Sequence, residues 1–190
     1  MANQQGDLLD QTLRWMLDNL QGAYTAKFPK GHPKAGQPSV NSGTCILVFC
    51  YINALGKVLL KGGPPRRRGG QNVRQDFERF REFLRRCMPD FLSESNKKSL
   101  PQTPKGQIGG DEWLYEVFRC GFIHGFYPGI SVKWGRKPRL NEYWTQTQPK
   151  MFLNIDELVR GFNRGVQEFK RHVEADDDLR VNFKGYILSP

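Results

Sequence analysis

The stretch from residue 112 to residue 128 constrains the fold most, because it combines a nearly continuous apolar run with one fixed cation, Arg119. Four of its residues fall at helical spacing and predict one buried stripe: Leu114, Val117, Phe118 and Gly121. A helix that is apolar nearly all round is normally a central one. A guanidinium there needs a partner, since burying it unpaired costs several kcal/mol. The sequence therefore predicts either a carboxylate from a neighbouring helix or an anionic ligand beside Arg119.

His124 is the histidine nearest to Arg119 in sequence, five positions further along. On an ideal α-helix this spacing turns the two side chains about 140° apart, so a regular helix does not bring them to one face. Gly125 and Pro128 place the helix end close to His124. An altered last turn at that end is what would let the imidazole approach the guanidinium.

The segment Arg119–His124 resembles the R-x4-H signature of HEPN domains, which are helical bundles. Many HEPN domains are metal-independent ribonucleases of toxin–antitoxin, defence (CRISPR) and RNA-processing systems. The setting agrees with the family, because an aromatic run precedes Arg119 and a glycine follows His124. The resemblance implies that His124 is a general acid/base and that Arg119 holds the phosphoryl group of an RNA. It also implies a homodimer whose two signature helices face one groove, and an antitoxin-like protein as a further partner.

Two other functions stay open beside the nuclease. Catalytic HEPN members usually carry a polar residue directly after the arginine, where this chain has Cys120. That difference favours a non-catalytic HEPN-like module that binds RNA, a nucleotide or a protein. The third alternative is a purely structural interaction protein in which Arg119 is a core ion-pair residue.

The remaining apolar periodicity predicts one mainly α domain over residues 1–190, an antiparallel bundle of four to five helices. We expect helices over about 7–21, 45–60 and 72–86, a signature helix capped by Asp111, and a long last helix capped by Asn154. Pro89 should end or kink the third helix. Loops rich in glycine, proline and lysine are expected over about 22–42, 61–71 and 93–110. A β-hairpin over about 129–153 would pair strands 129–134 and 149–153, and residues 179–188 would add a strand or wrap across the bundle.

Several polar residues of the predicted helices are candidates for the surroundings of Arg119. Asn53 interrupts the apolar face of the second helix, where it is either a satisfied core amide or part of the same cleft. Cys120 and Tyr127 are the other candidates for that cleft. Glu82 of the third helix is a candidate carboxylate for Arg119. Phe122, Phe126 and Tyr127 offer apolar surface for the expected dimer.

A formal net charge of +10 favours a polyanionic partner, with nucleic acid ahead of acidic membranes and proteins. Arg66, Arg67 and Arg68 concentrate charge in a glycine- and proline-rich loop, which can contact a phosphate backbone or can be a solvated connection. The predicted hairpin interleaves cations and rings, as proteins that bind single strands do: Lys133, Trp134, Arg136, Lys137, Arg139, Tyr143 and Trp144. The alternative is that these rings pack the hairpin against the bundle.

We expect neither a metal nor another cofactor. The four cysteines form no C-x-x-C pair and the three histidines are scattered, so a zinc site is not predicted. Buried free thiols in a reducing cytosol account for the cysteines. The first ten residues lack the hydrophobic core of a secretory signal, and the apolar run 44–51 is too short to span a bilayer. These features predict a soluble cytoplasmic protein without a membrane partner.

Overall fold

The computed structural model describes residues 3–27, 30–31, 33–36, 41–60, 72–96, 110–121, 132–147 and 150–188. These residues form a mainly helical protein with a small three-stranded sheet. The α-helices are α1 (Asn3–Thr25), α2 (Asn41–Leu59), α3 (Asn72–Cys87), α4 (Pro89–Asn96), α5 (Gly110–Leu114), α7 (Ile155–Ala175) and α8 (Asp177–Leu188). A π-helix, η1 (Tyr115–Cys120), continues α5, and the strands are β1 (Val132–Gly135), β2 (Trp144–Thr147) and β3 (Lys150–Asn154).

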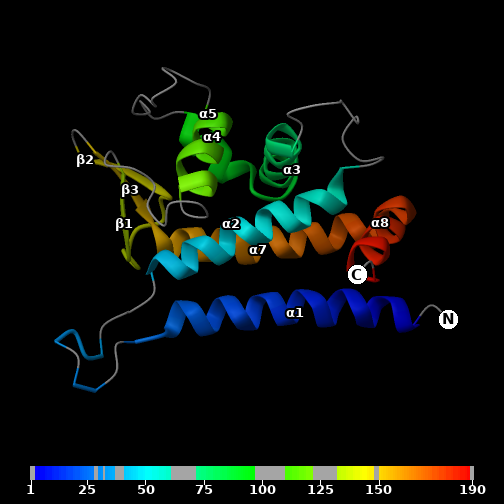
Figure 1. Cartoon of the computed structure of the whole chain (residues 1–190), viewed down its shortest axis with the longest axis horizontal. Helices are drawn as coiled ribbons and strands as arrows, with labels where there is room; N and C mark the ends of the chain where they lie inside the picture. Colours follow the sequence, from blue (N-terminus) through cyan, green and yellow to red (C-terminus); the bar gives the residue numbers. More distant parts are fainter. Residues whose placement is uncertain are drawn as a thin grey trace.

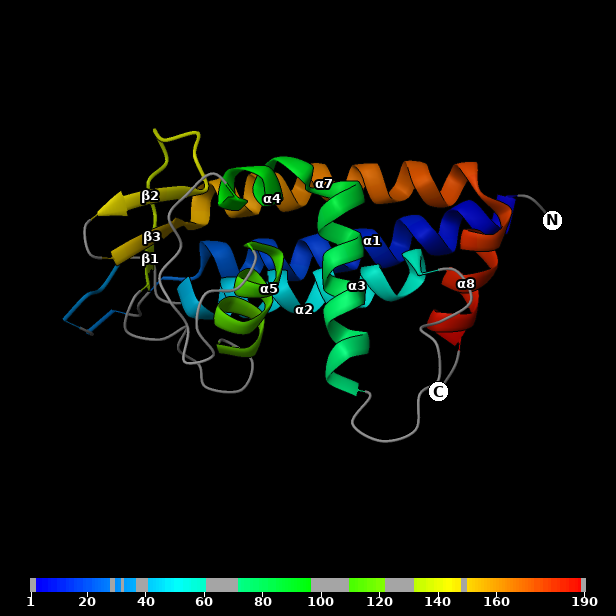
Figure 2. The same ribbon diagram turned by 90° about the horizontal axis from the view of Figure 1, so that it is seen from above.

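Helix α2 is central, with contacts to α1, α3, α7, α8 and η1. Figures 1 and 2 show α1 antiparallel to α2 and α7, whereas α2 and α7 run in the same direction and α3 crosses them. The predicted antiparallel arrangement therefore holds for α1 and α2 but not for α2 and α7. The sheet lies where α2 and α7 begin, so the chain passes through it and starts α7 from the same end as α2.

A close backbone approach fixes the crossing of α2 over α3. A Cβ atom on Gly56 would lie 1.9 Å from the carbonyl oxygen of Arg79, so only glycine allows this contact. Aromatic pairs fill the layers on both sides. The rings of Phe49 and Phe80 join α2 to α3 with 6.0 Å between centroids, and those of Phe83 and Phe162 join α3 to α7 at 6.1 Å.

Helix α1 is longer than the predicted 7–21 because it continues to Thr25. Its stripe of Leu9, Leu13, Met16 and Leu20 is buried, as the periodicity predicts. Trp15 lies off this stripe with 61% of its surface exposed, and its ring meets that of Tyr51 edge-on at 6.4 Å.

The third helix ends at Cys87, and Pro89 opens α4 after one intervening residue, so the predicted break is confirmed. The loop expected from residue 93 is wrong over 93–96, where α4 continues. The continuation has a tertiary role. The carboxylate of Glu94 accepts hydrogen bonds from the backbone N–H groups of Tyr143 (3.2 Å) and Trp144 (2.8 Å), which fixes the start of β2 against α4.

The predicted pairing of strand 129–134 with strand 149–153 as a hairpin is wrong. The sheet has the order β1-β3-β2, with β1 parallel to β3 and β2 antiparallel to it. The hairpin consists of β2 and β3, because Trp144, inside the expected turn, begins a strand of its own opposite Leu153.

The last two helices follow from local signals. Asn154 caps α7 by accepting a hydrogen bond from the N–H of Asp156, as predicted, and the apolar stripe of α7 from Ile155 to Val173 is buried. Of the two alternatives for 179–188, the strand is wrong, because these residues form α8, which packs against α7 and α2 of the bundle. Leu179 and Phe183 of α8 are buried, four residues apart on one helical face.

One described helix, α2, has a stretch (Ser42–Leu59) long and apolar enough to cross a membrane. In this structure 56% of that stretch is buried inside the molecule, as in the core helix of a soluble protein.

Candidate functional site

The signature segment begins as the α-helix α5 and becomes the π-helix η1 before it reaches Arg119. Trp113, Leu114 and Tyr115 anchor it in the core, each with 2% or less of its surface exposed. Of the predicted stripe, Leu114 is buried and Val117 is partly buried. A π-helical turn is closed by i→i+5 hydrogen bonds instead of the i→i+4 bonds of an α-helix, and such turns are frequent at functional sites.

Arg119 is paired with a carboxylate of a neighbouring helix, one of the two partners that the sequence predicted for it. Its Nη2 lies 2.9 Å from Oδ2 of Asp76 in α3, and 12% of its side chain is exposed. The other oxygen of Asp76 accepts a hydrogen bond from Arg79 at 2.9 Å, so two guanidiniums share one carboxylate. The predicted partner Glu82 is instead paired with Arg85 and Arg86 on its own helix.

The ring of Tyr115 packs against the guanidinium of this ion pair. The guanidinium carbon of Arg119 lies 5.4 Å from the centroid of that ring, and Phe77 and Phe80 meet the same ring edge-on. Burial raises the pKa of Tyr115 to about 12, although the charge of Arg119 opposes the rise. The phenol therefore stays neutral through the physiological range.

The charge of Arg119 also affects the pKa of two thiols. Burial raises the pKa of Cys120, and the neighbouring guanidinium partly offsets that rise. The same two effects, with the same net direction, act on Cys50 of α2. Neither group gains the lowered pKa of a reactive cysteine. Cys50 places the middle of α2 beside Arg119.

Asn53 stands one turn after Cys50 on α2 and one turn before Gly56, the residue in contact with α3. Asn53 as a whole is partly buried, and its side-chain oxygen Oδ1 is buried without a hydrogen bond from the described residues. The amide therefore lies on the stretch of α2 between the Cys50 and Gly56 contacts. That Asn53 belongs to the surroundings of Arg119 stays a prediction.

The π-helical geometry changes how the spacing of Arg119 and His124 should be interpreted. Tyr115 and Cys120 are five apart, and their side chains interact closely enough to shift the pKa of each. The α-helical estimate of about 140° for a spacing of five therefore does not apply within η1. His124, Tyr127 and Arg66–Arg68 lie outside the described residues, as do Phe122 and Phe126 of the expected dimer surface.

The predicted nucleic-acid residues of the sheet region differ in burial and in their contacts within the protein. Tyr143 and Trp144 are buried, with 4% and 0% exposure, so these rings pack the sheet against the bundle. Trp134 is partly buried and donates its Nε1–H to Oγ of Ser42 at 3.2 Å. Arg136 donates to the backbone oxygen of Tyr24 and lies over that ring at 4.1 Å. The cations Lys133 and Arg139 are exposed.

Sequence reasoning missed two groups that the structure brings forward. The sequence analysis did not single out Asp76, although its position one turn before Arg79 was a signal for an ion pair within the helix. The side chain of Asn154 was predicted only as a helix cap. It also accepts a hydrogen bond from the N–H of Lys137 and donates to the carbonyls of Leu140 (2.9 Å) and Glu142 (3.1 Å).

The described residues contain no cluster of three or more side chains that could hold a metal ion. All four cysteines are free thiols: Cys45 and Cys87 are buried, and Cys50 and Cys120 are partly buried. Comparison of the chain with protein-family models, with curated proteins and with solved structures gave no match.

Proposed function

We propose that this chain is a HEPN-like, metal-independent endoribonuclease in which Arg119 and His124 act on one RNA phosphate. The observation that carries the proposal is the π-helical turn at the signature segment. Tyr115 and Cys120 interact across a spacing of five in this turn. Arg119 and His124 have the same spacing. The π-helix itself ends at Cys120 and Gly121 is α-helical, so the approach of the imidazole to the guanidinium is part of the proposal.

In the proposed reaction the ribose 2′-OH attacks the adjacent phosphorus. His124 takes the hydroxyl proton as general base and supplies a proton to the leaving 5′-oxygen as general acid, a role that suits a group with a pKa near neutrality. Arg119 stabilises the negative charge that builds up on the phosphoryl oxygens. The products are a 2′,3′-cyclic phosphate and a 5′-hydroxyl.

The surroundings of Arg119 support this role for the guanidinium. Its side chain is largely shielded from water, and charge interactions are stronger in such an environment. Asp76 is shared by two guanidiniums, those of Arg79 and Arg119.

The test of this proposal is RNA cleavage in excess EDTA with analysis of the product ends. We expect 2′,3′-cyclic phosphate ends, and a loss of about 10²-fold or more in rate for His124→Ala. His172→Ala is the matched control, because His172 lies on α7 outside the proposed site. Wild-type protein that leaves varied RNAs intact, or a His124→Ala protein that cleaves equally well, would end the nuclease proposal.

The second candidate is a non-catalytic HEPN-like module that binds RNA, a nucleotide or a protein. Two observations favour it. Asp76 already forms an ion pair with Arg119, and the residue after Arg119 is the partly buried thiol Cys120 rather than a polar group. Such a module would bind RNA without cutting it. Either function is compatible with a homodimer and with an antitoxin-like partner, and sedimentation at high concentration tests the dimer directly.

A further inference from the structure

The outer face of the sheet carries a row of three side chains, one from each strand. The register aligns Lys133 of β1 and Thr145 of β2 with Phe152 of β3. Their neighbours along the strands, Val132, Trp144, Met151 and Leu153, are buried. Because side chains alternate along a strand, the row faces away from the bundle.

The segment 136–142 runs beside this row and is fixed by a buried amide. The side chain of Asn154, with 0% exposure, binds the N–H of Lys137 and the carbonyls of Lys137, Leu140 and Glu142. The Nη2 of Arg160 donates to the Leu140 carbonyl as well, at 3.0 Å. The loop is therefore held from inside the protein, and its side chains project from a fixed backbone.

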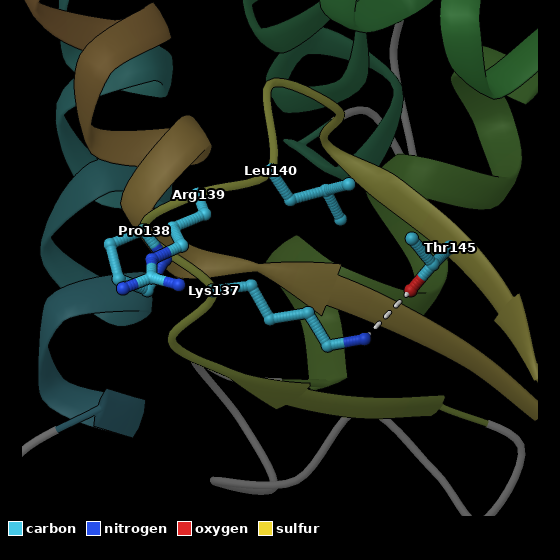
Figure 3. A pocket seen from close by; sticks show the side chains of 5 residues that line it. All are labelled: Lys137, Pro138, Arg139, Leu140 and Thr145. Atoms are coloured by element: carbon cyan, nitrogen blue, oxygen red, sulfur yellow. Dashed lines mark hydrogen bonds between the residues drawn. The ribbon is translucent and has the colours of Figure 1, made fainter.

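An open pocket of about 550 Å³ lies between this loop and β2, lined by Lys137, Pro138, Arg139, Leu140 and Thr145. Figure 3 shows Lys137 extending over the sheet to Thr145 with Leu140 above it, while Arg139 points to the other side and lies beside Pro138. The Nζ of Lys137 is 3.5 Å from Oγ1 of Thr145 and 4.3 Å from the centroid of the Phe152 ring.

The charge of this pocket is not compensated by its lining. No acidic residue lines it, and neither Lys137 nor Arg139 forms an ion pair with a carboxylate in the described part of the chain. Arg139 and Pro138 are exposed, and Lys137 and Leu140 are partly buried. Arg136 differs, because its guanidinium is engaged by the end of α1 at Tyr24.

We propose that this pocket binds the phosphate backbone of single-stranded RNA, with Lys137 and Arg139, which point in opposite directions in Figure 3, on two neighbouring phosphates. A charge-assisted contact from arginine is one of the stronger hydrogen bonds to phosphate. Pro138 and Leu140 supply apolar walls for the adjoining nucleoside, and the open shape admits a chain that continues on both sides. Lys133, exposed in the row of the outer face, extends the positive surface along β1. The choice of RNA as the ligand rests on the proposed function. The inference adds phosphate positions outside the Arg119 ion pair.

The test measures binding of single-stranded poly(U) to His124→Ala protein, so that the RNA stays intact. On this background, Lys137→Gln/Arg139→Gln is compared with Arg171→Gln/Arg180→Gln, which removes two positive charges at the end of the bundle opposite the sheet. Each phosphate contact on a single strand contributes about 0.7 to the slope of log K against log salt, so two lost contacts should lower it by about 1.4. The same slope predicts roughly tenfold weaker binding at physiological salt. The control should change neither quantity.

The outcomes separate this pocket from the nuclease proposal. Unchanged binding by Lys137→Gln/Arg139→Gln, or an equal loss in the control, would overturn the pocket, as would His124→Ala protein that does not bind poly(U). Binding that depends on Lys137 and Arg139 in a wild-type protein that cuts no RNA would remove the nuclease and leave the pocket standing. Thermal unfolding of both double variants verifies that the folds are intact.

Discussion

Asp76 of α3 holds Arg119 of the signature segment with 2.9 Å between Oδ2 and Nη2, and it holds Arg79 of its own helix with its other oxygen. One carboxylate thus joins α3 to η1 and sets the position of the cation on which the proposed chemistry depends. It also competes with any phosphate that approaches Arg119. Stability and anion binding therefore make opposite demands on this residue.

Asp76→Asn should destabilise the fold and strengthen RNA binding. The substitution keeps the volume but removes the charge from two hydrogen bonds, each contributing about 1.5–3 kcal/mol when one partner is charged. We expect a lower urea midpoint together with tighter binding of poly(U) to the His124→Ala background. Glu78→Gln is the control, because its 3.9 Å pair with Arg81 is exposed and should contribute about 0–1 kcal/mol. Weaker poly(U) binding by Asp76→Asn would show that Arg119 does not contact the RNA.

Gly56→Ala should disrupt the crossing of α2 over α3. Its Cβ would meet the Arg79 carbonyl at 1.9 Å, and overpacking of this kind costs about 1–3 kcal/mol or more. Gly22→Ala is the matched control in α1, where nothing lies within 4 Å of the new Cβ. There the helix should gain about 0.5–1 kcal/mol. Urea unfolding of both variants measures the two opposite effects, and equal stability of the two proteins would contradict this account.

Asn154→Ala should loosen the pocket loop as well as α7. Loss of a helix cap costs about 1 kcal/mol, and the carbonyls of Leu140 and Glu142 lose their donor at a further cost of about 1–3 kcal/mol. Hydrogen exchange should rise at the amide of Lys137, which donates to Asn154 in the native protein. Asn141→Ala, at an exposed position of the same loop, should stay within about 0.5 kcal/mol of wild type. Unchanged exchange at Lys137 would mean that the buried amide does not fix the loop.

The stability of the protein should fall as the pH rises from about 10 towards 12. Burial raises the pKa of Tyr115 to about 12 from the ordinary value of 10.0, so folding favours the neutral phenol. This contribution is complete below the unfolded pKa and is lost as the pH passes the folded one. Tyr115→Phe keeps the ring contacts and should flatten this part of the curve of unfolding free energy against pH. An identical alkaline slope in wild type and Tyr115→Phe would show that Tyr115 is not its source.

Local signals in the sequence predicted the parts of the fold that depend on neighbouring residues. The Asn154 cap, the break at Pro89 and the buried stripe of α7 depend on contacts within a few positions. Helix α8 was not predicted, although Leu179 and Phe183 stand four apart and two acidic residues open it. Asp176, just before the helix, accepts hydrogen bonds from the N–H groups of Asp178 and Leu179.

Partners distant in sequence were not predictable in the same way. The choice between Asp76 and Glu82 for Arg119 depends on how α3 crosses α2, and the backbone contact at Gly56 sets that crossing. The parallel pairing of β1 with β3 depends on β2 taking the other edge, which no period in the sequence encodes. For the candidate site, the sequence identified the cation and the need for a partner. It did not reveal the π-helical turn, because an i to i+5 register has no apolar signature of its own.

The double role of Asn154 has a mechanical consequence. It is the last residue of β3 and the cap of α7, so no residue between the strand and the helix is free to act as a hinge. β3 and the start of α7 are therefore joined without a flexible linker. Ten residues of continuous regular structure connect Phe152 on the outer face of the sheet to Phe162 in the core. The ring of Phe162 packs against that of Phe83 in α3, the helix that holds Arg119 through Asp76.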